Sequence, residues 1–356
     1  MAVKKKGAPR GKTSSAKTPL LILSSSPHFH SRVSTQRLMG DVLIALIPAV
    51  IAATVFYGPR TLLMLAVAIA VCVLSEYLAR KVMQRPNTIS DLSATVTAVI
   101  LTLNLPIDMP LWQLALGCVA AIIVVKQIFG GIGQNFVNPA MTARLMLVTS
   151  FGSSFTRYST PDFMIKHGLV DSVRSLSEVD AITSASPLTA LKAGPAGVAS
   201  APSIKDMIFG LHSTAAIGET CTIAILIGLI WLLARRVIKI HIPLAFVGTV
   251  AVLSLLFSGF DFTFMLYQLL SGGLLFAAVF MATDYTTSPL TNKGKIIYGI
   301  GLGVITCLIR FWGNLPEGVS FSLILMNIFV PHIDNWTRTP IFGQKEAERL
   351  EKEAQG

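Results

Sequence analysis

The sequence predicts an all-α polytopic membrane protein with about ten transmembrane helices, arranged as two inverted five-helix repeats in which some helices are short or broken. Three observations support this fold class. The 356 residues are 53% hydrophobic and 13% charged, with a mean hydropathy of +0.66, whereas a soluble domain carries about 25% charged residues. The apolar residues form long runs, and the two halves contain similar stretches. These features favour a chain that crosses a bilayer repeatedly.

Ten apolar segments follow one another along the chain. A helix needs about 20 residues to cross a bilayer, so the short third, fifth and tenth segments are expected to be broken, tilted or re-entrant. Irregular backbone of that kind is stable at membrane depth only where it faces protein or a cavity. The segments are 39–57, 61–79, 92–105, 111–129, 137–150, 215–234, 242–258, 264–282, 296–312 and 319–332.

These segments divide the chain into five parts: a basic N-terminal segment (1–37), a first membrane repeat (38–150), an outer loop (151–213), a second membrane repeat (214–335) and a C-terminal tail (336–356). "FGGIGQNFVNPAMTARLML" (129–147) aligns weakly with 311–329, and "LPIDMPL" (105–111) falls near "YTTSPLT" (285–291). Five segments per half would invert one half relative to the other. Inverted repeats commonly place a binding site where they meet.

The net charge of +11 is distributed in a way that indicates topology. If the N-terminal segment is cytoplasmic, most basic residues fall in cytoplasmic loops and tails, as the positive-inside rule requires. Both termini are then cytoplasmic, and the loop 151–213 lies outside. No stripe of charge suggests a nucleic-acid partner. The loop residues counted on the cytoplasmic side are Arg80, Lys81, Arg85, Lys126, Arg235, Arg236, Lys239, Lys293 and Lys295.

No metal site is expected. His28 and His30 form an H-x-H pair in "SSSPHFHS", but no further ligands accompany them. The cysteines lie far apart within apolar runs and lack the spacing of zinc or iron–sulfur sites. They are Cys72, Cys118, Cys221 and Cys307.

The outer loop contains "EVDAITSASPLTA" (178–190), with Thr183, Ser184 and Ser186 within four positions. A hydroxyl can accept a phosphoryl group if a separate enzyme activates it. Pro187 favours extended backbone at Ser186, which suits such an enzyme. The alternative is an ordinary Ser/Thr-rich turn, which the pattern alone favours.

Two further polar motifs flank apolar segments. In "GGIGQNFVNPAMTAR" (130–144), Asn135 and Asn138 offer amides three residues apart, and Asn138 is suited to cap a helix that begins at Pro139. A Gly-rich turn before a capped helix is the equally supported alternative. In "MATDYTTSPLT" (281–291), Asp284 ends an apolar run. An ionisable group at membrane depth predicts a functional role, whereas an interfacial position would carry no such implication.

Taken in order along nearly the whole chain, these motifs resemble the family that comprises the D subunit of Rnf complexes and its paralogue, the B subunit of the sodium-pumping NADH:quinone reductase. "SPH" before the first span and the compact outer loop favour the Rnf branch. The resemblance implies a ten-helix inverted-repeat protein of the bacterial inner membrane.

The resemblance also implies two flavins. One is FMN, joined through its phosphate to an outer-loop hydroxyl in a pattern that is usually S-G-A-T with the last residue as acceptor. Here Asp180 precedes Thr183, Ser184, Ala185 and Ser186, and Ser186 is the expected acceptor because serine keeps the required oxygen. The other is a non-covalent flavin, expected to be riboflavin. Asn135, Asn138 and Asp284 are the expected neighbours of this second flavin, although Asp284 could lie on an ion path instead.

The implied function is electron relay between ferredoxin and NAD sites on other subunits, coupled to Na⁺ or H⁺ translocation. The chain would be a subunit of a translocase without a complete active site of its own. Expected partners are the periplasmic covalent-flavin G subunit, the membrane A, E and C subunits, a flavin transferase during maturation, and the bilayer. Two alternatives stay open: a cofactor-free inverted-repeat channel or transporter for a small solute, and a structural anchor for a redox complex.

Overall fold

The computed structural model describes residues 34–155, 188, 191, 192, 194, 202–210, 216–313 and 318–338. Every described helix belongs to residues 35–356, which form one compact unit. The secondary structure of the described residues is helical and contains no strand. The predicted all-α class is confirmed.

Each predicted apolar segment coincides with helix. The first half contains α1 (Thr35–Tyr57), α2 (Arg60–Val82), the 3₁₀ helix η1 (Ile89–Asp91), α3 (Ser93–Leu103), α4 (Leu111–Val119), which continues into the π-helix η2 (Ala120–Gln127), α5 (Pro139–Ser150) and η3 (Gly152–Phe155). The second half contains α8 (Ile204–Phe209), η6 (Ile217–Glu219), α9 (Thr222–Ala234), α10 (His241–Ser258), α11 (Phe262–Leu270), α12 (Leu274–Phe280), α13 (Asn292–Trp312) and α14 (Val319–Trp336).

Several of these helices can span a membrane. Among the described residues, α1, α2, α10 and α13 are long and apolar enough, and α11 with α12, which meet at an angle of 55°, would make a fifth span. The outward face of α1 carries large exposed apolar side chains at helical spacing, including Ile44, Ile47 and Ile51. The chain is therefore a multi-pass membrane protein. Short and broken helices are present as predicted, and the number of ten crossings stays a prediction.

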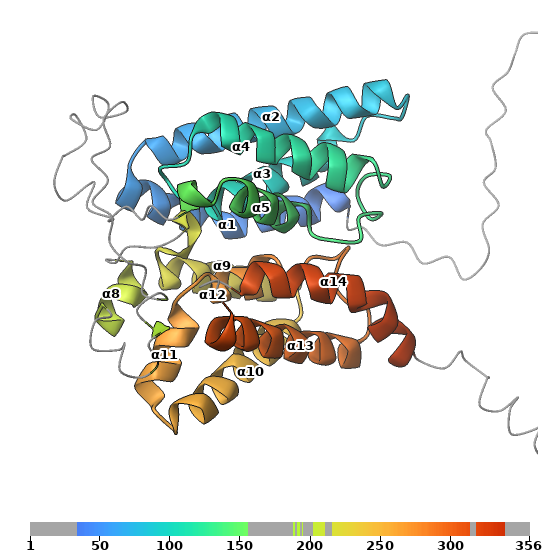
Figure 1. The fold of residues 1–356 in the computed structure, drawn as a ribbon. Helices are drawn as coiled ribbons and strands as arrows, with labels where there is room; N and C mark the ends of the chain where they lie inside the picture. Colours follow the sequence, from blue (N-terminus) through green and yellow to red (C-terminus); the bar gives the residue numbers. More distant parts are fainter. Residues whose placement is uncertain are drawn as a thin grey trace, which may run out of the picture. The chain divides into compact units, whose positions relative to one another are not determined.

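The two halves pack as two groups of helices (Figure 1), with α1–α5 in blue to green and α9–α14 in yellow to red. In the first half, α2 packs against α3 and α4, and α4 with η2 packs against α5. In the second half, α10 packs against α11, α12 and α13, and α13 packs against α14. This shared order of contacts supports an internal repeat. The relative inversion of the halves stays a prediction.

Residues 105–111 and 285–291, which resemble each other weakly in sequence, occupy equivalent places. The first stretch precedes α4 and the second precedes α13, so each joins the third element of its half to the fourth. The halves meet where α1 packs against α9 and α5 against α14. Arg235 Nε of the α9 end also lies 3.2 Å from Asp41 Oδ1 of α1. The region between the halves is therefore where a shared site would form.

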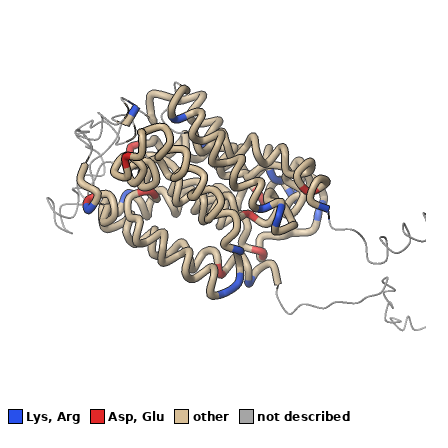
Figure 2. The backbone as a smooth tube through the Cα atoms, turned by 90° about the horizontal axis from the view of Figure 1, so that it is seen from below, with Lys and Arg blue, Asp and Glu red and all other residues tan. Residues whose placement is uncertain are grey.

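Charged residues are sparse along the middle of the helices and more frequent toward their ends (Figure 2). Within the second half, α10 and α13 approach closely. A methyl group on Gly299 of α13 would lie 2.7 Å from the Ala245 Cβ, and one on Gly303 would lie 2.5 Å from the Thr249 Cβ. This small-xxx-small spacing is typical of helix pairs packed within a membrane.

Candidate functional site

A cavity lies between the two halves of the chain. It holds about 760 Å³ of empty space, a volume that includes its opening to the outside. Its lining comes from α1, α3, η2, the loop before α5 and the start of that helix, the end of α9 and the residues after it, the end of α12 and the segment that follows α12. The polar lining residues are Ser93, Thr97, Lys126, Asn135, Asn138, Thr283, Asp284, Tyr285 and Thr286. Three residues singled out in the sequence, Asn135, Asn138 and Asp284, thus meet at one cavity.

The start of α5 forms one wall of this cavity. Asn138 caps the helix, because its Oδ1 accepts hydrogen bonds from Ala140 N at 3.1 Å and Met141 N at 3.3 Å. Pro139 occupies the first turn, where its missing N–H costs nothing. The predicted cap at Asn138 and the predicted helix start at Pro139 are confirmed, and this end of α5 lies at the cavity. The cap accounts for the amide oxygen of Asn138, and any role of this residue toward a ligand stays a prediction.

A hydrogen-bonded chain joins the two polar motifs of the sequence. Asn135 Nδ2 donates to Thr286 Oγ1 at 3.1 Å and to Val137 O at 3.1 Å. Thr286 Oγ1 in turn donates to Asp284 Oδ2 at 3.0 Å, and Thr287 Oγ1 donates to the same oxygen at 3.2 Å. The Gly-rich loop of the first half and the segment after α12 are thereby held together across the cavity.

Asp284 follows α12 and lines the cavity, where its carboxyl group is largely enclosed by protein. Burial of the carboxyl group raises the pKa of Asp284 above its usual range, while the hydrogen bonds from Thr286 and Thr287 lower it by less. A carboxyl group whose pKa is raised holds its proton to a higher pH and can donate it as a hydrogen bond. The side chain is thus able to exchange a proton with a bound molecule.

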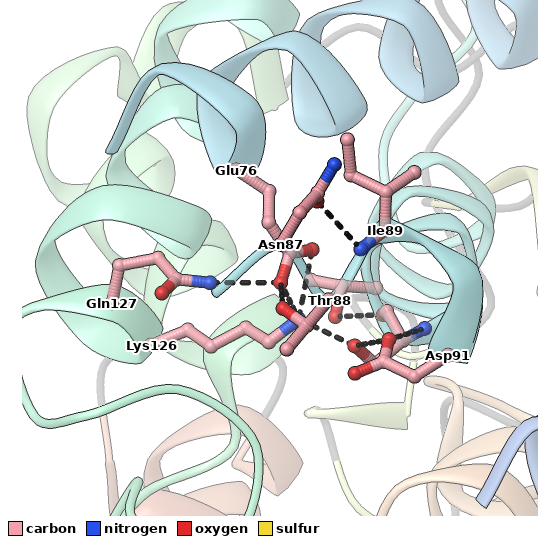
Figure 3. Close-up of polar contacts among 9 residues, drawn as sticks. Glu76, Asn87, Thr88, Ile89, Asp91, Lys126 and Gln127 are labelled. Carbon is pink, nitrogen blue, oxygen red and sulfur yellow. Dashed lines mark hydrogen bonds and ion pairs between the residues drawn. The ribbon is translucent and has the colours of Figure 1, made fainter. Parts of the chain in front are cut away.

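A buried ion pair adjoins the cavity (Figure 3). Lys126 Nζ of η2 lies 3.1 Å from Glu76 Oε2 of α2 and donates to Ser93 Oγ at 2.6 Å. Glu76 Oε1 also accepts hydrogen bonds from Gln127 Nε2 at 2.8 Å and Thr88 Oγ1 at 3.0 Å. The lysine and glutamate side chains are 3% and 0% exposed. Several hydrogen bonds therefore compensate each buried charge, as buried ions require.

The placement of Lys126 in a cytoplasmic loop is wrong. It lies inside the apolar helix that α4 and η2 form, and it is buried because Glu76 and Ser93 supply partners for its ammonium group. Lys126 and Ser93 also line the cavity. The sequence does contain a signal for this pair. Each of the two apolar segments 61–79 and 111–129 contains one ionisable residue, Glu76 and Lys126, and ionisable residues within apolar segments usually pair with one another. Lys126 thus brings to the edge of the cavity an ammonium group that is already paired with Glu76.

The predicted attachment motif, comprising Asp180, Thr183, Ser184, Ala185 and Ser186, lies outside the described residues. Leu188, two positions after Ser186, is described and is buried. Among the described residues, no group of three or more His, Cys, Asp or Glu side chains could hold a metal ion.

Fold and site together define a multi-pass helical membrane protein with a polar-edged cavity between its two halves. The sequence matches the NQR2, RnfD, RnfE family over residues 22–343, and relatives in this family cover almost the whole chain. The chain belongs to the NQR2, RnfD, RnfE family, which confirms the resemblance seen in the sequence.

Three relatives, each the D subunit of its own complex, show the extent of this similarity. The one from the Na(+)-translocating ferredoxin:NAD(+) oxidoreductase complex of Acetobacterium woodii is 40% identical over 335 residues, 94% of this chain and 98% of its own. The proton-translocating counterpart of Clostridium ljungdahlii is 36% identical over 342 residues, 92% of this chain and 98% of its own. The one from the ion-translocating oxidoreductase complex of Aliivibrio salmonicida is 35% identical over 348 residues, 91% of this chain and 99% of its own.

Proposed function

We propose that this chain is the D subunit of an Rnf-type ion-translocating ferredoxin:NAD oxidoreductase complex. It is a flavin-carrying membrane subunit that relays electrons between ferredoxin and NAD sites on other subunits, and this relay drives ion translocation. The match to D subunits of such complexes over more than nine-tenths of both chains supports this assignment. The coupling ion is Na⁺ or H⁺, since two relatives of similar identity are named for different ions.

The cavity is the proposed site of the non-covalent flavin, with riboflavin as the cofactor. The observation that carries this assignment is the meeting of Asn135, Asn138, Asp284 and Lys126 at one apolar-walled cavity. The residues fit the group, because apolar walls such as Val96 suit the faces of a flat ring system, while amides, a carboxyl and an ammonium suit its polar edge. When bound, a flavin supplies one- or two-electron transfer.

The residues of the chain then have distinct roles. The Asn135 and Asn138 amides orient the ring edge or the ribityl hydroxyls by hydrogen bonds. Asp284 holds a proton at its carboxyl group, and the Lys126 ammonium, which is paired with Glu76, donates hydrogen bonds at the edge of the cavity.

The second cofactor is FMN, joined by a phosphoester to Ser186 in the outer loop. Asp180, Thr183, Ser184 and Ala185 complete the motif that a flavin transferase recognises. The sequence pattern around Pro187, which favours an extended backbone at Ser186, supports this proposal.

The proposed setting is the inner membrane, with both termini in the cytoplasm and the outer loop in the periplasm. The partners are the other subunits of the complex, especially the periplasmic G subunit and the membrane A, E and C subunits. The placement of basic residues supports this orientation.

The experiment is to co-express the complex with its transferase, purify it, and examine this chain on a denaturing gel under ultraviolet light. We expect a fluorescent band that disappears in Ser186→Ala. A dark wild-type band overturns covalent attachment, and a fluorescent Ser186→Ala band moves the acceptor to Thr183 or Ser184.

The cavity needs a separate measurement. Flavin released by denaturation is quantified chromatographically in wild type, Asn135→Ala and Asp284→Asn, with exposed Lys81→Met as the matched control. We expect less riboflavin in Asn135→Ala and Asp284→Asn than in wild type, and an unchanged content in Lys81→Met. Full riboflavin content in both removes these residues from the site. A complex with no flavin on this subunit favours the cofactor-free transporter instead.

A further inference from the structure

Arg80 lies in the last turn of α2 and is only 7% exposed. It does not line the cavity between the halves. Among the described residues its guanidinium group has no hydrogen-bond or ion-pair partner, and its Nε atom is fully buried. Glu76, one turn earlier on α2, is paired with Lys126 and accepts a hydrogen bond from Gln127 (Figure 3). Because a buried arginine is normally paired with an anion, Arg80 indicates a site for a negatively charged ligand.

The Arg80 guanidinium group lies against the glycine-rich loop that follows η2. Gly130 and Gly131 have φ of +127° and +103°, a conformation that favours glycine. A Cβ atom on Gly131 would overlap Arg80 Nη2 and would lie 3.2 Å from Arg80 Cζ. The same atom would lie 3.6 Å from Gln127 Oε1, a neutral oxygen without a hydrogen-bond partner in the described part of the chain. The absence of a side chain at Gly131 therefore leaves room for the guanidinium group beside the loop backbone.

The end of α2 brings a second arginine to the same loop. Gln84 has φ of +52°, and Arg85 N donates to Arg80 O at 3.0 Å. A left-handed residue followed by this hydrogen bond forms a Schellman motif, which turns the chain back at the end of a helix. Arg85 Nη1 then donates to Gln127 O at 3.3 Å, the carbonyl group that also accepts from Gly130 N at 3.1 Å. Two arginines thus lie at the glycine-rich loop, and Arg85 is the exposed one.

Exposed apolar side chains border these arginines. Ile128 and Phe129, which directly precede the glycine pair, are 54% and 47% exposed, and Val82, two residues after Arg80, is 83% exposed. The Phe129 ring packs edge-on against the exposed Phe136, with ring centroids 4.9 Å apart. Because α2 is long and apolar enough to span a membrane, its end lies near the boundary between hydrocarbon and headgroups. The surroundings therefore suit a ligand that has both an anionic and an apolar part.

We propose that Arg80, Arg85 and the loop 130–133 bind the phosphate group of an anionic phospholipid. A guanidinium group donates two parallel hydrogen bonds to a phosphate, and basic pockets between membrane helices hold anionic headgroups. The acyl chains lie along Ile128 and Phe129. A free phosphate ion would satisfy the arginines by the same chemistry, but it would leave these apolar side chains uncovered.

A lipid at this site would also fix one wall of the cavity. Gln127 O accepts a hydrogen bond from Arg85, while Gln127 Nε2 donates to Glu76 Oε1 at 2.8 Å. Four residues after Gly131, the loop reaches Asn135, which lines the cavity. The headgroup thus holds together the end of α2, the end of η2 and the loop that carries Asn135.

The test measures lipid binding at the loop itself, in the purified complex after detergent has removed bound lipid. The reporter variant is Gln134→Cys, at an exposed residue whose Cγ would lie 3.0 Å from a Cβ atom on Gly130. Its reaction with a water-soluble maleimide is followed by mass spectrometry. We expect phosphatidylglycerol in mixed micelles to slow this reaction. Phosphatidylcholine, whose phosphate is already paired with choline, and inorganic phosphate at equal concentration should leave the rate unchanged.

Arginine variants are then compared in this reporter background. Arg80→Gln should need about tenfold or more phosphatidylglycerol for half protection, because it loses charge-assisted hydrogen bonds. Arg80→Lys, which keeps the charge but not the planar fork, should fall between Arg80→Gln and the unchanged arginine. Arg236→Gln, at an exposed arginine just after α9, removes the same charge and should leave protection unchanged.

Equal protection with and without Arg80 overturns the proposal, as does a lack of protection by phosphatidylglycerol. Equal protection by inorganic phosphate overturns the lipid as the ligand and assigns the site to a free anion. If a subunit dissociates in Arg80→Gln and lipid gives no protection, Arg80 pairs with an acidic side chain of a partner, which also overturns the proposal. If Arg80→Gln does not assemble, Arg85→Gln at the exposed arginine takes its place. It should weaken protection by phosphatidylglycerol, and unchanged protection in this variant overturns the proposal.

Discussion

Lys126 Nζ and Glu76 Oε2 lie 3.1 Å apart in a part of the chain where both side chains are almost fully buried. One residue comes from the π-helix η2 and the other from α2, and Lys126 also lines the cavity. The pair is neutral as a unit, so its burial is tolerated only while both partners are present. Negative charge in the cavity would compete with Glu76 for the ammonium group.

Removal of one partner of this pair should strongly destabilise the folded chain. Lys126→Met leaves Glu76 as an uncompensated buried charge, and such losses cost about 3–5 kcal/mol. The double variant Glu76→Gln/Lys126→Met should cost less than the sum of the single variants, because it buries no lone charge. The thermal unfolding midpoint of the purified complex measures this. Exposed Lys81→Met on α2 is the control; an equal midpoint for Lys126→Met would contradict the prediction.

Thr286 links Asn135 to Asp284 through one hydroxyl group. Thr286→Val keeps the shape of the side chain but removes one hydrogen bond from each partner, while Asn135 keeps its bond to Val137 O and Asp284 keeps its bond from Thr287. Each lost hydrogen bond should cost about 0.5–1.5 kcal/mol. Thr286→Ser keeps the hydroxyl and should retain most of the stability. Thermal unfolding and riboflavin content should fall together in the valine variant. Equal behaviour of valine and serine would show that the hydroxyl link is unimportant.

The raised pKa of Asp284 predicts a pH dependence with a defined sign. Burial favours the protonated carboxyl in the folded chain, so its contribution to stability is full below the ordinary pKa of about 4 and is lost as pH rises through the raised value. Asp284→Asn cannot ionise. Its unfolding midpoint relative to wild type should therefore rise with pH across this window. Asp284→Glu keeps an ionisable group and should retain the pH dependence. A constant difference between Asp284→Asn and wild type at every pH would rule the effect out.

The sequence predicted those features that depend on local chemistry. Apolar runs located the helices, and Asn138 with Pro139 marked the start of α5, because a cap and a first-turn proline act within a few residues. The motifs around Asn135 and Asp284 drew attention to residues that meet at the cavity. Their proposed flavin roles stay predictions.

Features that depend on contacts between residues far apart in the chain could not be predicted from the sequence. Lys126 resembled a topology-setting loop charge, because its burial depends on Glu76, fifty positions away. The burial of Leu188 and Leu191 could not be read from their polar surroundings, since Met207, Phe264 and Tyr267 come from other helices. In both cases the partner is supplied by the tertiary fold and leaves no local pattern.

Gly272 provides the last test, at the break between α11 and α12. Gly272→Ala would place a methyl group 2.8 Å from both Leu188 Cδ2 and Arg310 Nη2, at a φ of +70°. The left-handed conformation alone costs about 1–2 kcal/mol for a residue with a Cβ atom, and displacement of Leu188 or Arg310 adds to this cost. Gly248→Ala is the matched control, because no heavy atom lies within 4 Å of its added Cβ. In the interior of α10 that change should stabilise by up to about 1 kcal/mol. The thermal unfolding midpoint should thus fall in Gly272→Ala and rise in Gly248→Ala. A cysteine placed at the buried position 188 by Leu188→Cys should react faster with a water-soluble maleimide only when Gly272→Ala is also present. If both alanine variants behave alike, the break does not constrain its neighbours.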